Sequence, residues 1–174
     1  AYRLFIPPEY DPANQYPLVL FLHGASSATD NATQVAGAVG PLVFGAEENQ
    51  QKQASFLLVP TTTAPWMSVA DSVLEVLTNL QQRFPIDPDR LYVTGLSGGG
   101  VATFDFLAYR PGLFAAGISM SGASAIIKAP AIAHIPIWAF CGAADNSFVT
   151  GVRQMVDALG ASGGRPIYTE YIRG

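Results

Sequence analysis

Leu91-Tyr92-Val93-Thr94-Gly95-Leu96-Ser97-Gly98-Gly99 is the stretch that decides the fold of this chain. A short β-forming run precedes the serine, glycines stand two positions before and after it, and apolar residues at helical spacing follow at Val101, Phe104 and Leu107. A strand, a serine on a sharp turn and a helix, in this order, are typical of a nucleophile elbow. A side chain at either of the two glycines would collide with a neighbouring strand or helix. The alternative is a glycine-rich turn that caps a helix.

Further short runs of β-branched and aromatic residues flank this stretch and end in glycine, proline or small polar residues. They alternate with segments of helical spacing, which predicts an α/β fold: a doubly wound, mostly parallel sheet with helices on both faces. In such sheets ligands bind at the carboxyl ends of the strands, so site residues are expected to follow strands. The expected strands are Tyr2–Ile6, Leu18–Leu22, Phe56–Val59, Leu91–Thr94, Ala116–Met120, Ile137–Phe140 and Ile167–Ile172.

Besides the helix after Ser97, the apolar spacing predicts two others. One begins after Ser68, an expected N-cap with Asp71 three residues on, and is stopped by Pro85. Its apolar positions are Val69, Val73, Val76, Leu77, Leu80 and Phe84. The other ends at Gly160 and has its apolar positions at Val149, Val152, Met155, Val156 and Leu159.

The composition argues for one domain and against several classes of function. The chain has 174 residues, 49% of them apolar, enough for one sizeable core but not for two ordinary domains. Only 13% are charged and the net charge is −4, so we expect no binding to nucleic acid or to anionic lipid. No apolar run approaches the roughly 20 residues of a membrane span. The single cysteine, Cys141, excludes an internal disulfide and a thiolate metal cage.

An oxyanion hole requires two backbone N–H groups that point at the developing charge. Gly98 is expected to supply the first, because it follows Ser97 at the N-terminus of a helix. The second is expected from Ala25, in the loop after the strand Leu18–Leu22. His23 in the same loop is expected to form the turn, with the role of general base as its alternative.

Asp145 is the candidate for the acid that orients a catalytic base. It lies in the loop after the strand Ile137–Phe140, which places it at the same edge of the sheet as Ser97. The alternative is an aspartate that caps the helix beginning near Phe148. Asp71 and Asp105 lie within helices and suit the role less well.

The base is harder to place, because the chain has only two histidines. His134 stands before a strand and therefore at the opposite edge of the sheet from Ser97, so we expect it to be structural. In the order serine, aspartate, histidine, the base belongs after the strand Ile167–Ile172. We therefore expect the histidine just after Gly174.

At this point the residues resemble the α/β-hydrolase esterases, which include polyhydroxybutyrate depolymerases and feruloyl esterases. The resemblance runs nearly from end to end. It is carried by Tyr2–Pro7, by Pro17–Gly24, by Ile86–Gly100, which is the most specific stretch, and by Ile135–Ile137 leading to Asp145.

The resemblance implies Ser97 as nucleophile, Asp145 as triad acid, and Ala25 and Gly98 as oxyanion donors. Cys141 departs from the family, which often has a histidine at this place, and the family's Gly-His after the last strand is absent. We therefore expect residues 1–174 to be a single but incomplete catalytic domain, with a strand upstream of Tyr2 as well. Extracellular or periplasmic placement is what the family suggests.

These observations predict a serine carboxylesterase that hydrolyses short-chain or aryl esters, on small molecules or polymers, without a cofactor. Trp66, in the loop after the strand Phe56–Val59, is a candidate wall of the substrate pocket, or else an ordinary core or surface tryptophan. A serine peptidase of the same fold and a catalytically incomplete binding module are the alternatives. Cys141, without an evident base, is expected to be a small buried residue and not a second nucleophile.

Overall fold

A single twisted sheet organises the chain in the computed structural model, which describes residues 1–24 and 40–172. Within these residues the strand order is β1-β3-β2-β4-β5-β6-β7, and every neighbouring pair is parallel except β1 with β3. The strands are β1 (Tyr2–Phe5), β2 (Tyr16–Leu22), β3 (Phe56–Pro60), β4 (Ile86–Leu96), β5 (Ala116–Met120), β6 (Ile137–Gly142) and β7 (Ile167–Tyr171).

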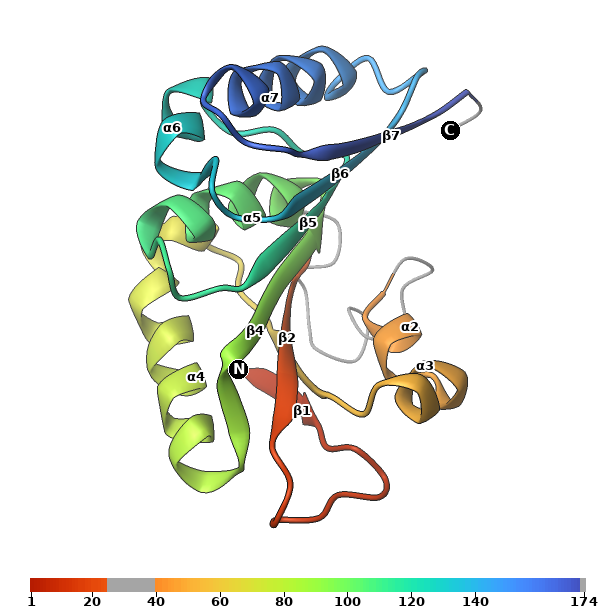
Figure 1. Ribbon diagram of the computed structural model, residues 1–174, viewed down its shortest axis with the longest axis vertical. Helices are drawn as coiled ribbons and strands as arrows, with labels where there is room; N and C mark the ends of the chain where they lie inside the picture. The colour runs from red at the N-terminus through yellow and green to blue at the C-terminus, as the bar shows by residue number, and fades with distance from the viewer. Residues whose placement is uncertain (25–39, 173–174) are drawn as a thin grey trace.

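Helices cover both faces of this sheet (Figure 1). The longer ones lie on one face, and the short α2 and α3 lie on the other. The predicted doubly wound, mostly parallel α/β fold is therefore confirmed. The helices are α2 (Leu42–Gly45), α3 (Glu47–Lys52), α4 (Ala70–Arg83), α5 (Gly98–Tyr109), α6 (Ala129–Ile132) and α7 (Val149–Ala161), with 3₁₀ turns at Trp66–Ser68 and Ile126–Lys128.

The core lies between the sheet and the helices α4 and α5, which cover one of its faces. Phe104, Phe106 and Leu107 of α5 are fully buried, as are Leu18 and Leu20 of β2. Central strands of a parallel sheet are covered on both faces, which explains why β2 is an almost continuous apolar run. This packing fixes the ends of β2 and β4 relative to α5, and those ends carry the candidate site.

Two predicted helix ends need correction. Val69, not Ser68, is the N-cap of α4, because Ser68 closes the preceding 3₁₀ turn and its Oγ donates to the Pro65 carbonyl. The helix α7 passes Gly160 and ends at Ala161, and Gly163 takes the positive φ of 87° that the chain reversal requires. The predicted stop at Pro85 agrees with α4, which ends at Arg83.

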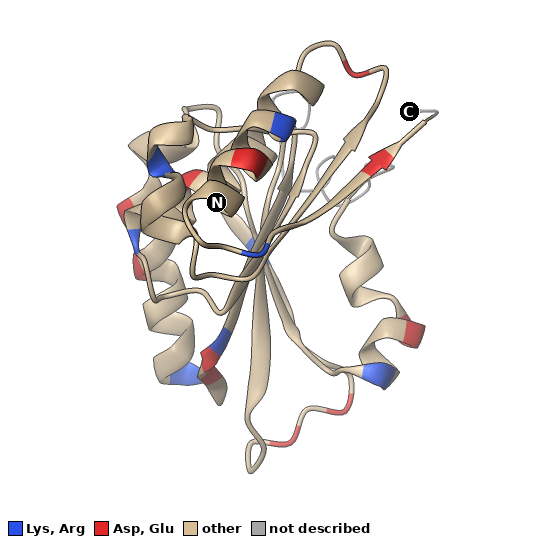
Figure 2. Ribbon diagram, turned by 45° about the horizontal axis from the view of Figure 1, so that its top comes forward, with Lys and Arg blue, Asp and Glu red and all other residues tan. Residues whose placement is uncertain are grey.

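Charged residues of both signs are scattered over the helices and loops, and the middle strands of the sheet carry few of them (Figure 2). This distribution agrees with the low charged fraction of 13%. Across residues 1–24 and 40–172, no helix is long and apolar enough to cross a membrane.

Candidate active site

The residues singled out by the sequence gather at the carboxyl edge of the sheet. His23 and Gly24 follow β2, Trp66 lies in the segment after β3, Ser97 follows β4 and Asp145 follows β6. Because these strands are parallel, their carboxyl ends share one edge. The expectation that site residues follow strands is therefore met for these positions.

Ser97 occupies a strained turn between β4 and α5. Its φ is 56° and its ψ is −118°, a backbone conformation that non-glycine residues rarely adopt. The turn is held from both sides, because the Ser97 N–H donates to the Met120 carbonyl at 2.9 Å and the Ser97 carbonyl accepts from the Val101 N–H at 2.9 Å. Ser97 is also the N-cap residue of α5 and makes no side-chain capping bond, so its hydroxyl is not used to stabilise the helix.

The two glycines that flank Ser97 at a distance of two residues are required by packing. A Cβ at Gly95 would lie 2.4 Å from the Gly99 carbonyl oxygen, and a Cβ at Gly99 would lie 1.9 Å from the Leu22 carbonyl oxygen. Both contacts are with backbone atoms, which cannot rotate away. The absence of side chains at 95 and 99 lets β4, α5 and the end of β2 meet closely, and this contact creates the turn at Ser97.

Backbone N–H groups lie next to the serine. Gly98 is the first residue of α5, so its N–H has no acceptor within the helix and carries part of the positive end of the helix dipole. Gly24 packs directly against the serine: a Cβ built on it would lie 3.2 Å from Ser97 Cβ and 3.8 Å from Ser97 Oγ. Ala25, the predicted second oxyanion donor, lies outside the described residues.

His23 holds two loops together and has no free ring nitrogen. The Thr62 N–H donates to His23 Nε2 at 3.2 Å, so Nε2 is unprotonated, and Nδ1 therefore donates to the Gly24 carbonyl at 2.8 Å. His23 is 4% exposed, and its ring packs on Trp66 with 4.7 Å between the ring centroids. These contacts agree with the structural role expected for His23 and argue against the alternative role of general base.

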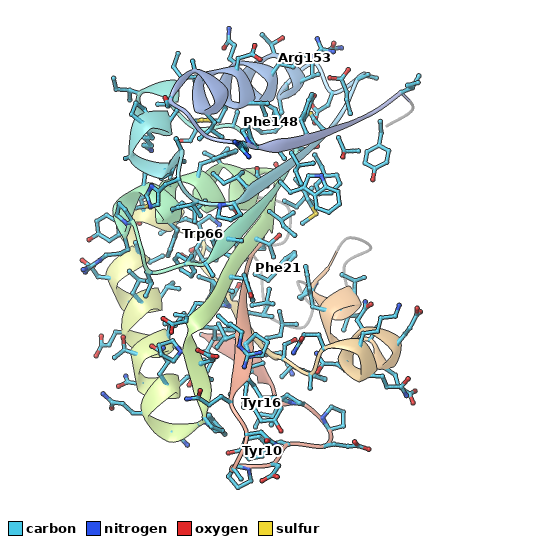
Figure 3. All side chains as sticks on the ribbon, viewed as in Figure 1. Tyr10, Tyr16, Phe21, Trp66, Phe148 and Arg153 are labelled. Carbon is cyan, nitrogen blue, oxygen red and sulfur yellow. The ribbon has the colours of Figure 1, made fainter. Side chains whose placement is uncertain are left out.

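Trp66 is buried in the same cluster, on the face of the sheet that α4 and α5 cover (Figure 3). Its Nε1 donates to the His23 carbonyl at 3.0 Å, which ties the segment after β3 to the end of β2. One side of the ring belongs to the core, and the ring also lines a cavity beside Ser97. Trp66 is therefore a core tryptophan that also lines this cavity, and its role as a wall of a substrate pocket stays a prediction.

Asp145 lies in the turn after β6 and is partly exposed. Its Oδ1 accepts from the Ser147 N–H at 3.2 Å. Phe148, not Asp145, is the N-cap of α7 and makes no side-chain capping bond, so the helix-capping alternative does not describe this aspartate. Asp145 Oδ2 faces the Cys141 sulfur at 4.0 Å.

Cys141 is buried, as the sequence predicts. Burial raises the pKa of its thiol above the usual value, which disfavours the nucleophilic thiolate.

His134 is exposed and lies just before β6, at the opposite end of that strand from the carboxyl edge. Neither histidine of the chain is thus placed to act as a base for Ser97.

A cavity of about 630 Å³ adjoins the serine. Gly24 and Gly98, which both neighbour Ser97, line this cavity together with the segment after β3 and residues of α5. Among the described residues, no group of three His, Cys, Asp or Glu side chains is arranged to hold a metal ion. The described residues that line the cavity are His23, Gly24, Thr62, Thr63, Ala64, Pro65, Trp66, Met67, Gly98, Val101, Ala102 and Asp105.

Sequence reasoning missed two members of this site. Thr62 contributes only its backbone N–H, which no sequence pattern reveals. Asp105 was set aside because it lies in a helix, yet it stands seven residues after Gly98, or two helical turns, and therefore on the same face of α5. That spacing is the signal that could have placed it in the cavity.

Comparison with solved structures decides the fold family. A thermostable esterase superposes with a TM-score of 0.92 at 35% sequence identity, over 98% of this chain and 50% of the esterase chain. The chain has the α/β-hydrolase fold. The sequence profile of the prolyl oligopeptidase family, whose members share this fold, matches residues 68–146, which include Ser97 and Asp145.

Two curated relatives, a depolymerase and a probable endopeptidase, are similar in sequence to this chain. The poly(3-hydroxyalkanoate) depolymerase C of Paucimonas lemoignei is 31% identical over 120 residues, which are 64% of this chain and 28% of the depolymerase. A probable chloroplastic glutamyl endopeptidase of Oryza sativa subsp. japonica is 30% identical over 145 residues, 69% of this chain and 15% of the relative. The chain thus spans half or less of the length of these proteins. The resemblance to α/β-hydrolase esterases is confirmed.

Proposed function

We propose that this α/β-hydrolase is a serine carboxylesterase that forms an acyl-enzyme on Ser97. The observation that carries the proposal is the turn at Ser97, where a strained serine lies against Gly24 and is followed by the Gly98 N–H, which has no acceptor within α5. The thermostable esterase and the depolymerase support ester chemistry. The proposed substrates are short-chain or aryl carboxylic esters, on small molecules or on a polymer.

In the proposed mechanism Ser97 Oγ attacks the ester carbonyl and its proton passes to a histidine. The Gly98 N–H donates to the resulting oxyanion, and Ala25 is proposed as the second donor. The histidine then protonates the leaving alcohol as the C–O bond breaks. Water attacks the acyl-enzyme by the same route, releases the carboxylic acid and restores the Ser97 hydroxyl. No step requires a cofactor.

Asp145 is proposed to orient that histidine. His23 has both ring nitrogens engaged and His134 lies at the other edge of the sheet, so we propose that a histidine outside residues 1–174 supplies the base. Asp145 follows β6, the strand beside β7, and a residue in the segment after β7 would lie within its reach.

Turnover of p-nitrophenyl acetate by the full-length protein tests this proposal. Ser97→Ala is expected to lower kcat by at least about a thousandfold, because no nucleophile remains. Ser162→Ala, which removes an exposed serine after α7, is the matched control and keeps the parent rate. Equal turnover by the Ser97→Ala protein would contradict the proposal. No ester turnover by the full-length parent would favour a binding module on the same fold.

A serine peptidase is the second candidate, because the family profile and the rice relative both belong to peptidases. The same acyl-enzyme chemistry serves an amide substrate. The two candidates are separated by comparing kcat/KM for a peptide p-nitroanilide and for the p-nitrophenyl ester of the same acyl group. An esterase prefers the ester by a larger factor than the greater intrinsic reactivity of the ester explains. A peptidase cleaves the anilide at a rate comparable to that of the ester.

A further inference from the structure

The cavity beside Ser97 is lined in part by a carboxylate that the proposed mechanism does not use. Asp105 lines this cavity, and its side chain is 15% exposed. Gly98 and Asp105 stand seven residues apart on α5, so about 10 Å of helix separates the oxyanion donor from the carboxylate. Between them the cavity is lined mainly by apolar groups, among them Trp66, Met67 and Val101. A chain of apolar substrate atoms fits this stretch, with Asp105 at its far end.

One oxygen of the Asp105 carboxylate is already occupied. Ser124 Oγ and Lys128 Nζ both donate to Oδ1, and Lys128 Nζ also donates to Ser124 Oγ at 3.0 Å. Within residues 1–24 and 40–172, Oδ2 accepts no hydrogen bond. The carboxylate is therefore fixed in place through one oxygen, and the other oxygen retains its acceptor capacity.

The charges around this oxygen define what it would accept. An anionic substrate group is repelled by the carboxylate, and the ammonium of Lys128, bonded to the same carboxylate, repels a cationic one. A neutral hydroxyl is repelled by neither the carboxylate nor the ammonium. It can donate to the charged carboxylate, and such a hydrogen bond is stronger than one to a neutral acceptor. The site thus matches a hydroxyl group at the end of an apolar chain.

We propose that Asp105 is a specificity-determining residue that selects esters whose acyl or alcohol chain ends in a hydroxyl group. The proposal rests on the esterase function proposed above, because it treats the cavity beside Ser97 as the substrate pocket. It names a substrate class, omega-hydroxy esters, for that pocket. A six-carbon chain, extended and followed by a hydrogen bond of about 2.8 Å, has the length to reach from the oxyanion donor to Asp105.

The test compares three p-nitrophenyl esters with the full-length protein: the hexanoate, its omega-hydroxy derivative and its omega-methoxy derivative. The methoxy group keeps the oxygen but cannot donate. We expect kcat/KM for the hydroxy ester to exceed that for the other two about tenfold, as for one hydrogen bond to a partly exposed charged acceptor. A second series carries the same three chains on the alcohol side as acetates, with acid release as the readout.

Two variants assign the preference to the carboxylate. Asp105→Ala is expected to bring the ratio of hydroxy to unsubstituted ester to about one, whatever happens to the overall rate. Lys128→Met removes the ion pair but leaves the carboxylate, so the hydroxy preference is retained. If Asp105 has a purely structural role, both variants lower the rates for all esters alike, and neither changes the ratio of hydroxy to unsubstituted ester.

The outcomes separate this proposal from the one on which it rests. If the parent hydrolyses p-nitrophenyl acetate but shows no hydroxy preference in either series, the role of Asp105 is wrong and the esterase function stands. The same holds if the preference survives in Asp105→Ala. If the parent hydrolyses none of these esters, the esterase function itself is wrong and the proposal for Asp105 falls with it.

Discussion

His23 is a member of the candidate active site whose ring makes only structural contacts among the described residues. Its ring accepts the Thr62 N–H, donates to the Gly24 carbonyl and packs on Trp66. Gly24 in turn lies against Ser97. Both hydrogen bonds require a neutral imidazole, because a proton on Nε2 would point at the Thr62 N–H, which is also a donor. His23 therefore positions the backbone beside Ser97, the proposed nucleophile.

Replacing His23 by alanine is expected to lower the free energy of unfolding by about 2 kcal/mol, because the Thr62 N–H and the Gly24 carbonyl lose a buried partner. Urea unfolding followed by circular dichroism measures this change. His134→Ala is the matched control: this exposed side chain should change the stability by less than about 0.5 kcal/mol. Equal effects of the two variants would show that the His23 contacts contribute nothing.

At the residue scale the sequence placed Ser97, Gly98, His23 and Asp145 after the strands where the structure has them. These predictions work because a residue that follows a parallel strand can only lie at one edge of the sheet. The hydrogen bond between Thr62 and His23 spans 39 positions and involves a backbone group, so no local pattern encodes it. Asp105 was missed for a related reason, since its place depends on which face of α5 meets the cavity.

At the scale of elements, close backbone contact between β2, β4 and α5 governs the site. Gly99 lies where a Cβ would meet the Leu22 carbonyl oxygen at 1.9 Å, whereas Gly160 in α7 has nothing within 4 Å of its Cβ position. The two glycines therefore lie in helices but under opposite constraints.

Gly99→Ala is expected to destabilise the fold by about 3 kcal/mol or more, because α5 must move away from β2. Gly160→Ala is expected to stabilise it by about 0.5 kcal/mol, because alanine is the better helix former and finds open space. Chemical denaturation of both variants measures the pair. A mild effect of Gly99→Ala, similar to that at Gly160, would contradict the close packing at the serine turn.

The edge strand β7 is joined to α7 by an exposed charge cluster. Arg153 donates to both oxygens of Glu170, at 2.8 and 2.5 Å, and the Tyr168 hydroxyl donates to the same carboxylate. The hydrogen bonds from Arg153 and then from Tyr168 lower the pKa of Glu170 to about 2. Burial first, and the bond to Glu170 second, raise the pKa of Tyr168 to about 12.

This cluster predicts a pH-dependent contribution to stability. A carboxylate whose pKa is lower in the folded state stabilises that state fully above its unfolded value, near 4.5, and loses the contribution as the pH falls toward 2. Glu170→Gln should therefore have a lower Tm than the parent at pH 6, with the difference shrinking between about pH 4.5 and pH 2. A Tm difference that is independent of pH would show that the carboxylate charge is not involved.

Elements with long apolar periodicity were predictable, and short polar ones were not. The spacing from Val69 to Phe84 marks α4 clearly. In contrast, α3 (Glu47–Lys52) is six residues long and buries only Gln50, whose Nε2 donates to the Phe44 carbonyl. Such a helix is stabilised by tertiary hydrogen bonds and not by an apolar stripe, so hydrophobic periodicity does not reveal it.

At the scale of the whole molecule, the alternation of strands and helices was enough to predict the layered α/β fold, because parallel strands require crossovers through a covering helix. The order of the strands in the sheet was not predictable, since β3 lies between β1 and β2 and no residue pattern states this arrangement. The same fold supports ester and peptide hydrolysis, so the architecture alone does not decide the substrate.

Trapping the acyl-enzyme tests the proposed role of Ser97 as nucleophile. The full-length protein is mixed with p-nitrophenyl acetate, quenched in acid within the first turnovers, digested and analysed by peptide mass spectrometry. We expect an acetyl group on the peptide that contains Ser97, and none on that peptide in Ser97→Ala. Rapid ester turnover with the acetyl group on another residue, or with no covalent adduct and undiminished activity in Ser97→Ala, would contradict it.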